Sequence, residues 1–290
     1  MPTPCSCDVT RLVRTLPQTD QGGAVAEQKA SAAEGFTKGA QKYDEAVRHN
    51  IAGSERLVMS LPDGDYATVL DVGCGTGWTS AAMVQRFDVK EIVGVDPAEG
   101  MLQQFAAKLG AEFPDVAVEL RNEDVMGMGV DDGAFDAVIC AMALHWFPDK
   151  PGAVARMGRA LRPGGVMGIL TAGRGGEDAW RELLERVGAS EDWTGWFALN
   201  QRDVDEMARD IRAAGLEPVD VWMERRRRHT DPDAFMARTR AVAAHLLGNP
   251  PGGYSELDQR IDAALHEAAG PEGFEYDYCK LFAVARTPGA

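Results

Sequence analysis

The chain has 290 residues, of which 45% are hydrophobic and 26% charged, and its 45 Asp and Glu against 30 Lys and Arg leave a formal net charge of −15. The hydrophobic fraction is typical of a globular protein with a full core and excludes wholesale disorder. The excess of acids disfavours a nucleic-acid-binding or membrane-surface protein, because both kinds of partner require Lys and Arg to neutralise phosphates.

The cysteines and the N-terminal segment predict the compartment. The chain contains Cys5, Cys7, Cys74, Cys140 and Cys279, an odd number that is widely scattered. Residues 1–30 contain no continuous apolar segment of the kind a signal peptide needs, so a reduced, cytoplasmic setting is expected. No apolar run reaches roughly 18 residues, and no transmembrane helix is expected. Cys5 and Cys7 lack a second Cys or His pair nearby, so no metal site is expected.

The N-terminal part of the chain predicts an arm followed by two helices. Residues 1–30 mix Pro, Gly, Gln, Ser and Thr without a sustained period, which predicts a loosely ordered arm. Apolar residues at three- and four-residue spacing predict a helix over about 31–49. A second helix is expected from about Ser54 to Met59, because the turn sequence Leu-Pro-Asp-Gly follows at 61–64.

Short apolar runs then alternate with amphipathic segments. This alternation is typical of βαβ units and predicts an α/β fold with a parallel sheet covered by helices on both faces. The expected strands lie at 68–72, 91–95, 116–120, 135–140 and 165–170, and the helical spacing is clearest at 101–109 and 151–161.

The C-terminal part predicts an insertion between the last two strands. Helices are expected at 177–187 and 204–214, a strand at about 217–224, two further helices at 232–247 and 255–269, and a closing strand at 279–285. The basic run Arg225–Arg228 with His229 is expected directly after the 217–224 strand, as a solvated strand end paired with acids; a grip on an acidic substrate is the alternative. Residues 230–278 are too long for an ordinary connection and are predicted to form a helical lid.

The sharpest motif is a buried strand that runs into a glycine-rich turn and then a helix. Its sequence is Asp71-Val72-Gly73-Cys74-Gly75-Thr76-Gly77. Glycines let the backbone approach a ligand closely. A dinucleotide site needs a third small residue where Trp78 stands, and Asp71 would repel a pyrophosphate. Both features disfavour a nucleotide-dependent oxidoreductase, which is kept as an alternative.

Two acids follow the next strands. Asp96 comes directly after the strand at 91–95, where an acid can accept both ribose hydroxyls of an adenosine. Asp124 follows the third strand and can accept a hydrogen bond from an adenine amino group, with Val125 lining the ring. A turn at 161–165, Leu-Arg-Pro-Gly-Gly, leads into the fifth strand.

These four motifs together resemble the class I S-adenosylmethionine-dependent methyltransferases over about residues 36–171, in order and approximate spacing. The resemblance implies a Rossmann-like seven-stranded, mostly parallel sheet with an antiparallel last strand, formed by residues 31–229 and 279–290, and S-adenosylmethionine as the cofactor. It also implies a cofactor site composed of Tyr43 on a covering N-terminal helix, Asp71 near the amino group, Gly73 and Gly75 against the methionine part, Asp96 on the ribose, Pro97 and Met101 flanking adenine, Asp124 and Val125 at its edge, and Ala141.

The acceptor side rests on the stretch Ala143-Leu144-His145-Trp146-Phe147, which follows the fourth strand at the carboxyl end of the sheet. It is similar to a stretch in trans-aconitate methyltransferase-like enzymes, which esterify carboxylates. His145 is the candidate catalytic base, and His145 and Trp146 are the candidate acceptor-binding residues. Packing beneath the cofactor is the alternative for both.

The predicted function is therefore methyl transfer to a small-molecule acceptor, a carboxylate or a hydroxyl. A catalytically silent, cofactor-binding partner subunit is the alternative from another class. No nucleic-acid or membrane partner is expected, and the chain is expected to act as a monomer or a homodimer.

Overall fold

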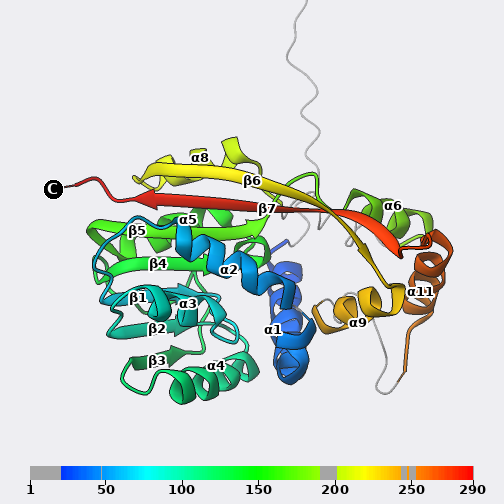
Figure 1. Cartoon of the computed structure of the whole chain (residues 1–290), viewed down its shortest axis with the longest axis horizontal. Helices are drawn as coiled ribbons and strands as arrows, with labels where there is room; N and C mark the ends of the chain where they lie inside the picture. Colours follow the sequence, from blue (N-terminus) through cyan, green and yellow to red (C-terminus); the bar gives the residue numbers. More distant parts are fainter. Residues whose placement is uncertain (1–20, 47, 190–200, 243–246, 248–252, 290) are drawn as a thin grey trace, which may run out of the picture.

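The computed structural model describes residues 21–46, 48–189, 201–242, 247 and 253–289, and is built around a seven-stranded sheet of order β3-β2-β1-β4-β5-β7-β6 (Figure 1). The strands are β1 Thr68–Val72, β2 Glu91–Val95, β3 Ala117–Arg121, β4 Phe135–Ala141, β5 Leu161–Ala172, β6 Glu217–Thr230 and β7 Phe274–Arg286. Strands β1 to β5 pair in parallel, and β7 runs antiparallel to both of its neighbours. The predicted sheet with its antiparallel last strand is confirmed.

Helices cover both faces of this sheet. Their bounds are α1 Gln21–Ala46, α2 Arg48–Ser60, α3 Trp78–Arg86, α4 Glu99–Glu112, the short 3₁₀ turn η1 Leu144–Trp146, α5 Lys150–Ala160, α6 Asp178–Arg186, α8 Val204–Ala213, α9 Pro232–Val242 and α11 Glu256–Ala268. Val58, Met83 and Phe105 bring α2, α3 and α4 into one apolar cluster. Met157 and Ile211 bring α5 and α8 into another. The burial of these two clusters stabilises the packing of the helices on the sheet.

The last two strands extend much further than the sequence suggested. The β6–β7 register runs from Glu217 opposite Arg286 to Thr230 opposite Phe274. The basic run therefore lies inside β6 rather than after it, and β7 begins at Phe274 rather than Cys279. Since β6 is antiparallel to β7, and β7 to β5, the end of β6 projects at the carboxyl edge of the sheet. In Figure 1 this hairpin reaches beyond the other strands toward α6, α9 and α11.

Three smaller boundaries also differ from expectation. Helix α1 begins at Gln21, inside the stretch expected to be a loose arm, and α2 begins at Arg48 rather than at about Ser54. Strand β5 includes the expected turn, because its register with β4 jumps from Phe135–Leu161 to Ala137–Val166 and leaves 162–165 as a bulge. Residues 1–20 of the expected arm and residues 243–246 of the helix expected at 232–247 lie outside the described residues.

The segment between β6 and β7 forms a small core of its own with α6. Trp180 of α6 packs against Phe235 of α9, with ring centroids 4.9 Å apart, and Phe235 packs against Tyr276 of β7 at 5.2 Å. Helix α11 begins as its sequence predicts, because the Ser255 side chain accepts a hydrogen bond from the Asp258 amide. Within the described ranges, no helix is long and apolar enough to span a bilayer.

Candidate cofactor and acceptor site

The glycine-rich turn after β1 leaves open space at one of its glycines. Gly73 and Gly75 have φ of +65° and +52°, a conformation that L side chains rarely adopt. A Cβ on Gly73 would lie 2.2 Å from Cβ of Ala143, so this glycine is required for packing. A Cβ on Gly75 would meet no atom within 4 Å, and Gly75 lines a cavity. A ligand group can therefore approach the backbone at Gly75 directly.

Asp96 holds this turn from the end of β2. Its Oδ2 accepts the Gly75 N–H at 2.9 Å and its Oδ1 accepts the Ala98 N–H at 2.8 Å. Burial raises the pKa of Asp96 to about 6, and the two amide donors only partly oppose that rise. A carboxylate oxygen can accept more than one hydrogen bond, so Asp96 keeps acceptor capacity toward a ligand.

Two adjoining cavities lie at the carboxyl ends of β1, β2 and β4. The first, of about 690 Å³, is lined by Tyr43, Gly73, Gly75, Asp96, Met101, Ala141 and Trp146 among others. The second, of about 680 Å³, is lined by Gly73, Asp96, Pro97, Asp124, Val125 and Trp146 among others. Ten of the twelve predicted site residues thus line one or both cavities. The two that line neither cavity are Asp71 and His145.

Asp71 lies beneath the turn rather than in a cavity. It is 1% exposed, and its Oδ2 accepts a hydrogen bond from Ser80 Oγ at 2.7 Å. Burial raises its pKa to about 7. In this structure Asp71 therefore connects β1 to α3, and the described cavity walls do not include it.

His145 is also absent from the lining of both cavities. Its Nδ1 lies 3.2 Å from Oγ1 of Thr171 on β5. Burial, with the nearby Lys150 cation, lowers the pKa of His145 to about 3, so the ring is neutral at pH 7. The geometry favours packing, the alternative interpretation, over a catalytic base. Trp146 behaves differently: it lines both cavities and packs edge-on against Phe36, with centroids 5.3 Å apart.

Helix α1 covers the site and is fastened to it by one acid. Asp44 accepts hydrogen bonds from Thr76 Oγ1 at 2.6 Å and from Lys108 Nζ at 2.9 Å. The Lys108 ammonium lies 3.7 Å from the centre of the Trp78 ring, which lines the first cavity. Tyr43, in the same helix, faces the site, and burial together with the Asp96 charge raises its pKa above the ordinary value.

Several residues that line the first cavity were not among the candidates drawn from the sequence, and they include Phe36, Ile51, Ser54 and Met142. Phe36, Ile51 and Ser54 come from α1 and α2, and Met142 follows β4 with φ of +55°. The first three reach the site through helix packing, which no local motif announces. Met142 stands directly before the Ala143–Phe147 stretch, so its position after β4 was the available signal.

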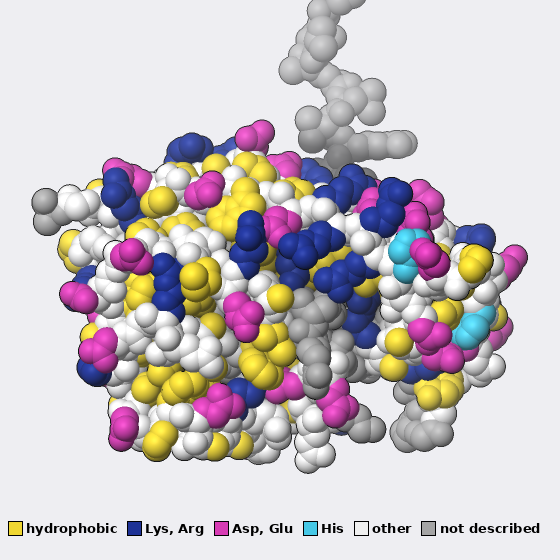
Figure 2. Space-filling view, in the orientation of Figure 1, with side chains coloured by type: hydrophobic (Ala, Val, Ile, Leu, Met, Phe, Trp, Pro, Cys, Tyr) yellow, Lys and Arg dark blue, Asp and Glu magenta, His cyan; other side chains and the backbone are white. Residues whose placement is uncertain are grey.

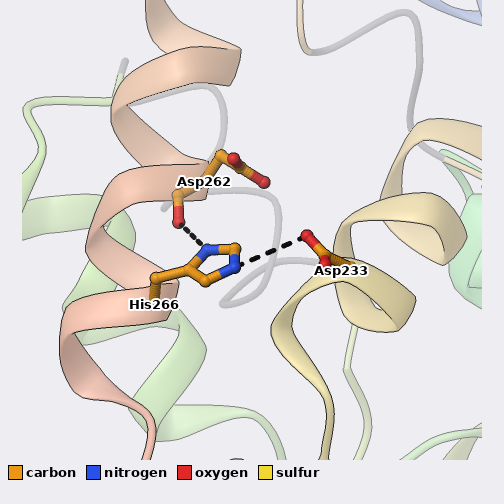
Figure 3. Close-up of side chains that lie close together, drawn as sticks. All are labelled: Asp233, Asp262 and His266. Carbon is orange, nitrogen blue, oxygen red and sulfur yellow. Dashed lines mark hydrogen bonds and ion pairs between the residues drawn. The ribbon is translucent and has the colours of Figure 1, made fainter.

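A separate cluster in the lid has metal-ligating side chains. Asp233, Asp262 and His266 lie together on α9 and α11, and all are at least partly exposed (Figure 3). His266 Nδ1 lies 2.9 Å from the carbonyl oxygen of Asp262, and Nε2 lies 3.5 Å from Asp233 Oδ1. One ring nitrogen is thus engaged by its own helix, and exposed groups of this kind are common without an ion. We assign no metal to them.

The comparisons with known proteins fit this site. The family described as "Methyltransferase domain" matches residues 69–165. A trans-aconitate 2-methyltransferase of Variovorax paradoxus is 31% identical over 217 residues, covering 73% of this chain and 78% of that protein. The chain belongs to the class I S-adenosylmethionine-dependent methyltransferases.

Other methyltransferases extend the comparison. A malonyl-[acyl-carrier protein] O-methyltransferase of Dechloromonas aromatica is 27% identical over 264 residues, covering 89% of this chain and 94% of that protein. A trans-aconitate 2-methyltransferase of Deinococcus radiodurans is 34% identical over 157 residues, 54% of this chain and only 57% of that protein. The crystal structure of a methyltransferase described as putative, from Bacillus halodurans, has a TM-score of 0.58 at 20% identity, covers 82% of this chain and 98% of that one, and shows the shared fold.

This methyltransferase is therefore an enzyme that uses S-adenosylmethionine as its methyl donor. The described residues fit that group on structural grounds, because the turn is open at Gly75 and a partly buried carboxylate, Asp96, lies beside it. Gly73 and Asp96 line both cavities, and Gly75 lines the first.

Proposed function

We propose that this methyltransferase acts on a small-molecule acceptor and methylates a carboxylate of that acceptor. The cofactor supplies an electrophilic methyl group on a sulfonium when it is bound. The chain's own residues bind the cofactor, exclude water and orient the acceptor oxygen in line with the bond that breaks. Such positioning contributes about 7–11 kcal/mol to lowering a barrier.

We assign the cofactor's parts by position. Gly73 and Gly75 receive the methionine part, and Asp96 accepts from the ribose hydroxyls. The second cavity, with Pro97, Asp124 and Val125, receives adenine, which leaves the part of the first cavity nearest Ala141 and Trp146 for the acceptor. The polar end of Asp124 and the apolar walls suit an aromatic base with an amino group.

One observation favours a carboxylate acceptor over a hydroxyl or amine. Among the described residues that line the first cavity, the ionisable side chains are Tyr43, Cys74 and Asp96. Burial raises the pKa of Tyr43 and of Cys74, so neither is a base at pH 7, and Asp96 is engaged by two backbone amides. A hydroxyl or ammonium acceptor needs a base, whereas a carboxylate is already a nucleophile. The names of the Variovorax and Dechloromonas relatives agree with an acidic acceptor.

The test is a product analysis with purified protein. S-adenosylmethionine labelled in the methyl group is incubated with a panel of small di- and tricarboxylates and with matched alcohols and amines. We expect label in alkali-labile methyl esters of one or more acids. Label found only in ethers or methylamines would contradict the carboxylate assignment, and S-adenosylhomocysteine binding measured by calorimetry separates an inactive acceptor panel from an inactive protein.

A further inference from the structure

One residue of the first cavity combines a side chain with a strained backbone. Met142 directly follows β4 and has φ of +55°, and among the described residues other than glycine only Glu177 also has a positive φ. The Met142 N–H donates to the carbonyl oxygen of Leu170 on β5 at 2.6 Å, which holds this conformation. Strained residues of this kind cluster at functional sites. Glycine would adopt the same backbone without strain, so what this position supplies is the methionine side chain.

The Met142 side chain borders the part of the first cavity that remains for the acceptor. Ala141, Met142 and Trp146 all line this cavity, and all follow from the carboxyl end of β4. The groups assigned to the cofactor come instead from the turn after β1 and from the end of β2. Phe36 of α1 and Ile51 of α2 add apolar walls to the same cavity. Met142 therefore stands on the acceptor side of the site.

Behind Met142 lies Tyr278 of β7. The Tyr278 hydroxyl donates to Met142 Sδ at 3.8 Å. Tyr278 also lines a second space, of about 400 Å³, together with Arg226 and Arg228 among others. Figure 2 shows Lys and Arg side chains gathered over this part of the hairpin. Among the described lining residues none is common to the two spaces, so on this side the first cavity ends at Met142.

Packing supports this end wall from several elements. Met142 packs against two apolar clusters. One includes Phe235 and belongs to the core of the lid, and the other includes Leu57 of α2 and Phe282 of β7. A methionine side chain is unbranched and fills irregular gaps between such elements. Because protein interiors are close-packed, a group that is too long for the cavity cannot displace this wall without disturbing its supports.

We propose that Met142 determines the length of the acid that this methyltransferase accepts, because its side chain forms the end wall of the acceptor part of the first cavity. This inference rests on the proposed function, since it assigns a specificity-determining residue to the same site. A short acid fits between the transferred methyl group and Met142, whereas a longer acid collides with the wall. The acceptor class is thereby narrowed to acids that end at this side chain.

The direct test measures the binding of a length series without turnover. The protein saturated with S-adenosylhomocysteine is titrated in a calorimeter with straight-chain dicarboxylates from malonate to suberate. We expect the wild-type affinity to fall beyond one length. Met142→Ala should move this limit upward by about two carbon atoms, because the space left by the shortened side chain does not fully collapse. For acids just above the wild-type limit, the affinity should rise about tenfold. An unchanged limit would overturn the proposal.

Control variants separate the wall from a general loosening of the core. Met142→Leu keeps most of the side-chain volume and should restore the wild-type limit. Met236→Ala removes the same kind of side chain from the lid core, where Met236 is fully buried and lines neither space. It should lower the unfolding temperature and leave the limit unchanged. Equal shifts of the limit in Met236→Ala and Met142→Ala would overturn the proposal. If Met142→Ala does not fold, Met142→Gly, which suits the left-handed backbone, replaces it.

A second series does not depend on the identity of the acceptor. Analogues of S-adenosylmethionine with an ethyl, propyl or butyl group in place of the methyl group are titrated into the same proteins. We expect Met142→Ala to bind the butyl analogue about tenfold more tightly than the wild-type protein does, with S-adenosylhomocysteine affinity unchanged.

The two series distinguish this inference from the proposed function. A wild-type protein that binds S-adenosylhomocysteine but no acid of the series contradicts the proposed function, and equal affinities of the two proteins for the butyl analogue would then overturn the role of Met142 as well. An ester-forming enzyme whose length limit does not respond to Met142→Ala contradicts this inference alone.

Discussion

Asp96 has two roles: its carboxylate accepts hydrogen bonds that hold the glycine-rich turn and, by our assignment, it also binds the ribose of the cofactor. Its two oxygens accept the amides of Gly75 and Ala98. We expect Asp96→Ala to abolish measurable S-adenosylhomocysteine binding and to destabilise the fold by about 1–3 kcal/mol for each amide left without a partner. Calorimetry and urea unfolding measure the two effects. Wild-type affinity in a folded variant would contradict the ribose assignment.

The same residue predicts a pH dependence. The pKa of Asp96 is raised to about 6, and ribose hydroxyls donate to the ionised form. Affinity should therefore be constant above pH 7 and fall as the pH drops through 6, to about one-tenth at pH 5. Asp96→Asn should remove this slope. A slope that persists in Asp96→Asn would assign it to another group.

Valine substitutions at Gly75 and at a distant glycine, Gly133, distinguish the effect of filling the cavity from the effect of backbone strain. Gly75 and Gly133 both have positive φ, +52° and +71°, and in both a Cβ would meet no atom within 4 Å. Valine in the left-handed region costs about 1–2 kcal/mol at either position. Only Gly75 lines the cavity, so Gly75→Val should lose cofactor binding and Gly133→Val should keep it. Equal affinities of the two folded variants in calorimetry would show that Gly75 does not contact the cofactor.

At the scale of helices and strands, the two lid helices are joined by an ion pair that titrates. His266 of α11 lies 3.5 Å from Asp233 of α9. The carbonyl of Asp262, and the charges of Asp233, Asp262 and Asp231, raise the pKa of His266 above its ordinary value. A raised pKa in the folded state means that the stabilisation is complete below about pH 6.5 and is lost as the pH rises through the folded value.

Hydrogen exchange of the lid helices measures this effect. Once exchange rates are corrected for intrinsic pH dependence, the amides of α9 and α11 should be better protected at pH 6 than at pH 8. His266→Gln should have the same protection at both. The pair is exposed, so we expect a small difference confined to these helices. A pH response that survives in His266→Gln would refute the link.

The sequence predicted most elements where local pattern and burial agree. The apolar runs at β1 and β2 gave their bounds, and Ser255 gave the start of α11. The C-terminal half of β6 was missed because four consecutive arginines have no apolar–polar alternation. Its partner did contain the signal: in Phe274-Glu-Tyr-Asp-Tyr278, aromatics alternate with acids, which is the period of a strand.

The residues of the candidate site also fall into two groups: those that a local motif predicts, and those that only the packing of distant segments brings to the cavity. Asp96 and Gly75 stand at strand ends, where the sheet itself determines position, so a motif in the sequence predicts them. Ile51 and Ser54 reach the cavity only because α2 packs on β5, which is a contact between segments far apart in the chain. The motif predicts that His145 follows β4, but the direction of its ring, toward Thr171, depends on the backbone of the turn Leu144–Trp146, which the motif does not determine.

At the scale of the whole molecule, the segment between β6 and β7 is a candidate lid that touches the cofactor's cover. Helix α9 packs against α1, and α1 supplies Phe36 and Tyr43 to the first cavity. We expect the addition of S-adenosylhomocysteine and a tricarboxylate to increase the protection of α1, α9 and α11 against hydrogen exchange. Closure of this kind shields the sulfonium from water.

A shortened variant tests whether the lid is needed. Residues 231–273 are replaced by an Asn-Gly turn, which closes the hairpin at the Thr230–Phe274 pair. The sheet should still form, and turnover should fall at least a hundredfold because the cavity stays open. Unchanged protection on ligand addition, together with full turnover in the shortened variant, would contradict the lid.

The long hairpin has a thermodynamic consequence. The end of β6 leads directly into α9, and α9 packs against α1, which supplies Phe36 and Tyr43 to the first cavity, so the segment proposed as the lid is in direct contact with the helix that covers the cofactor. Any free energy by which the bound ligands favour the closed lid must equal the free energy by which closure favours the bound ligands, since coupling between two equilibria is reciprocal. A competitor that enters the first cavity without favouring the closed lid would obtain none of this coupling, so discrimination against it would come from failure to close rather than from failure to bind.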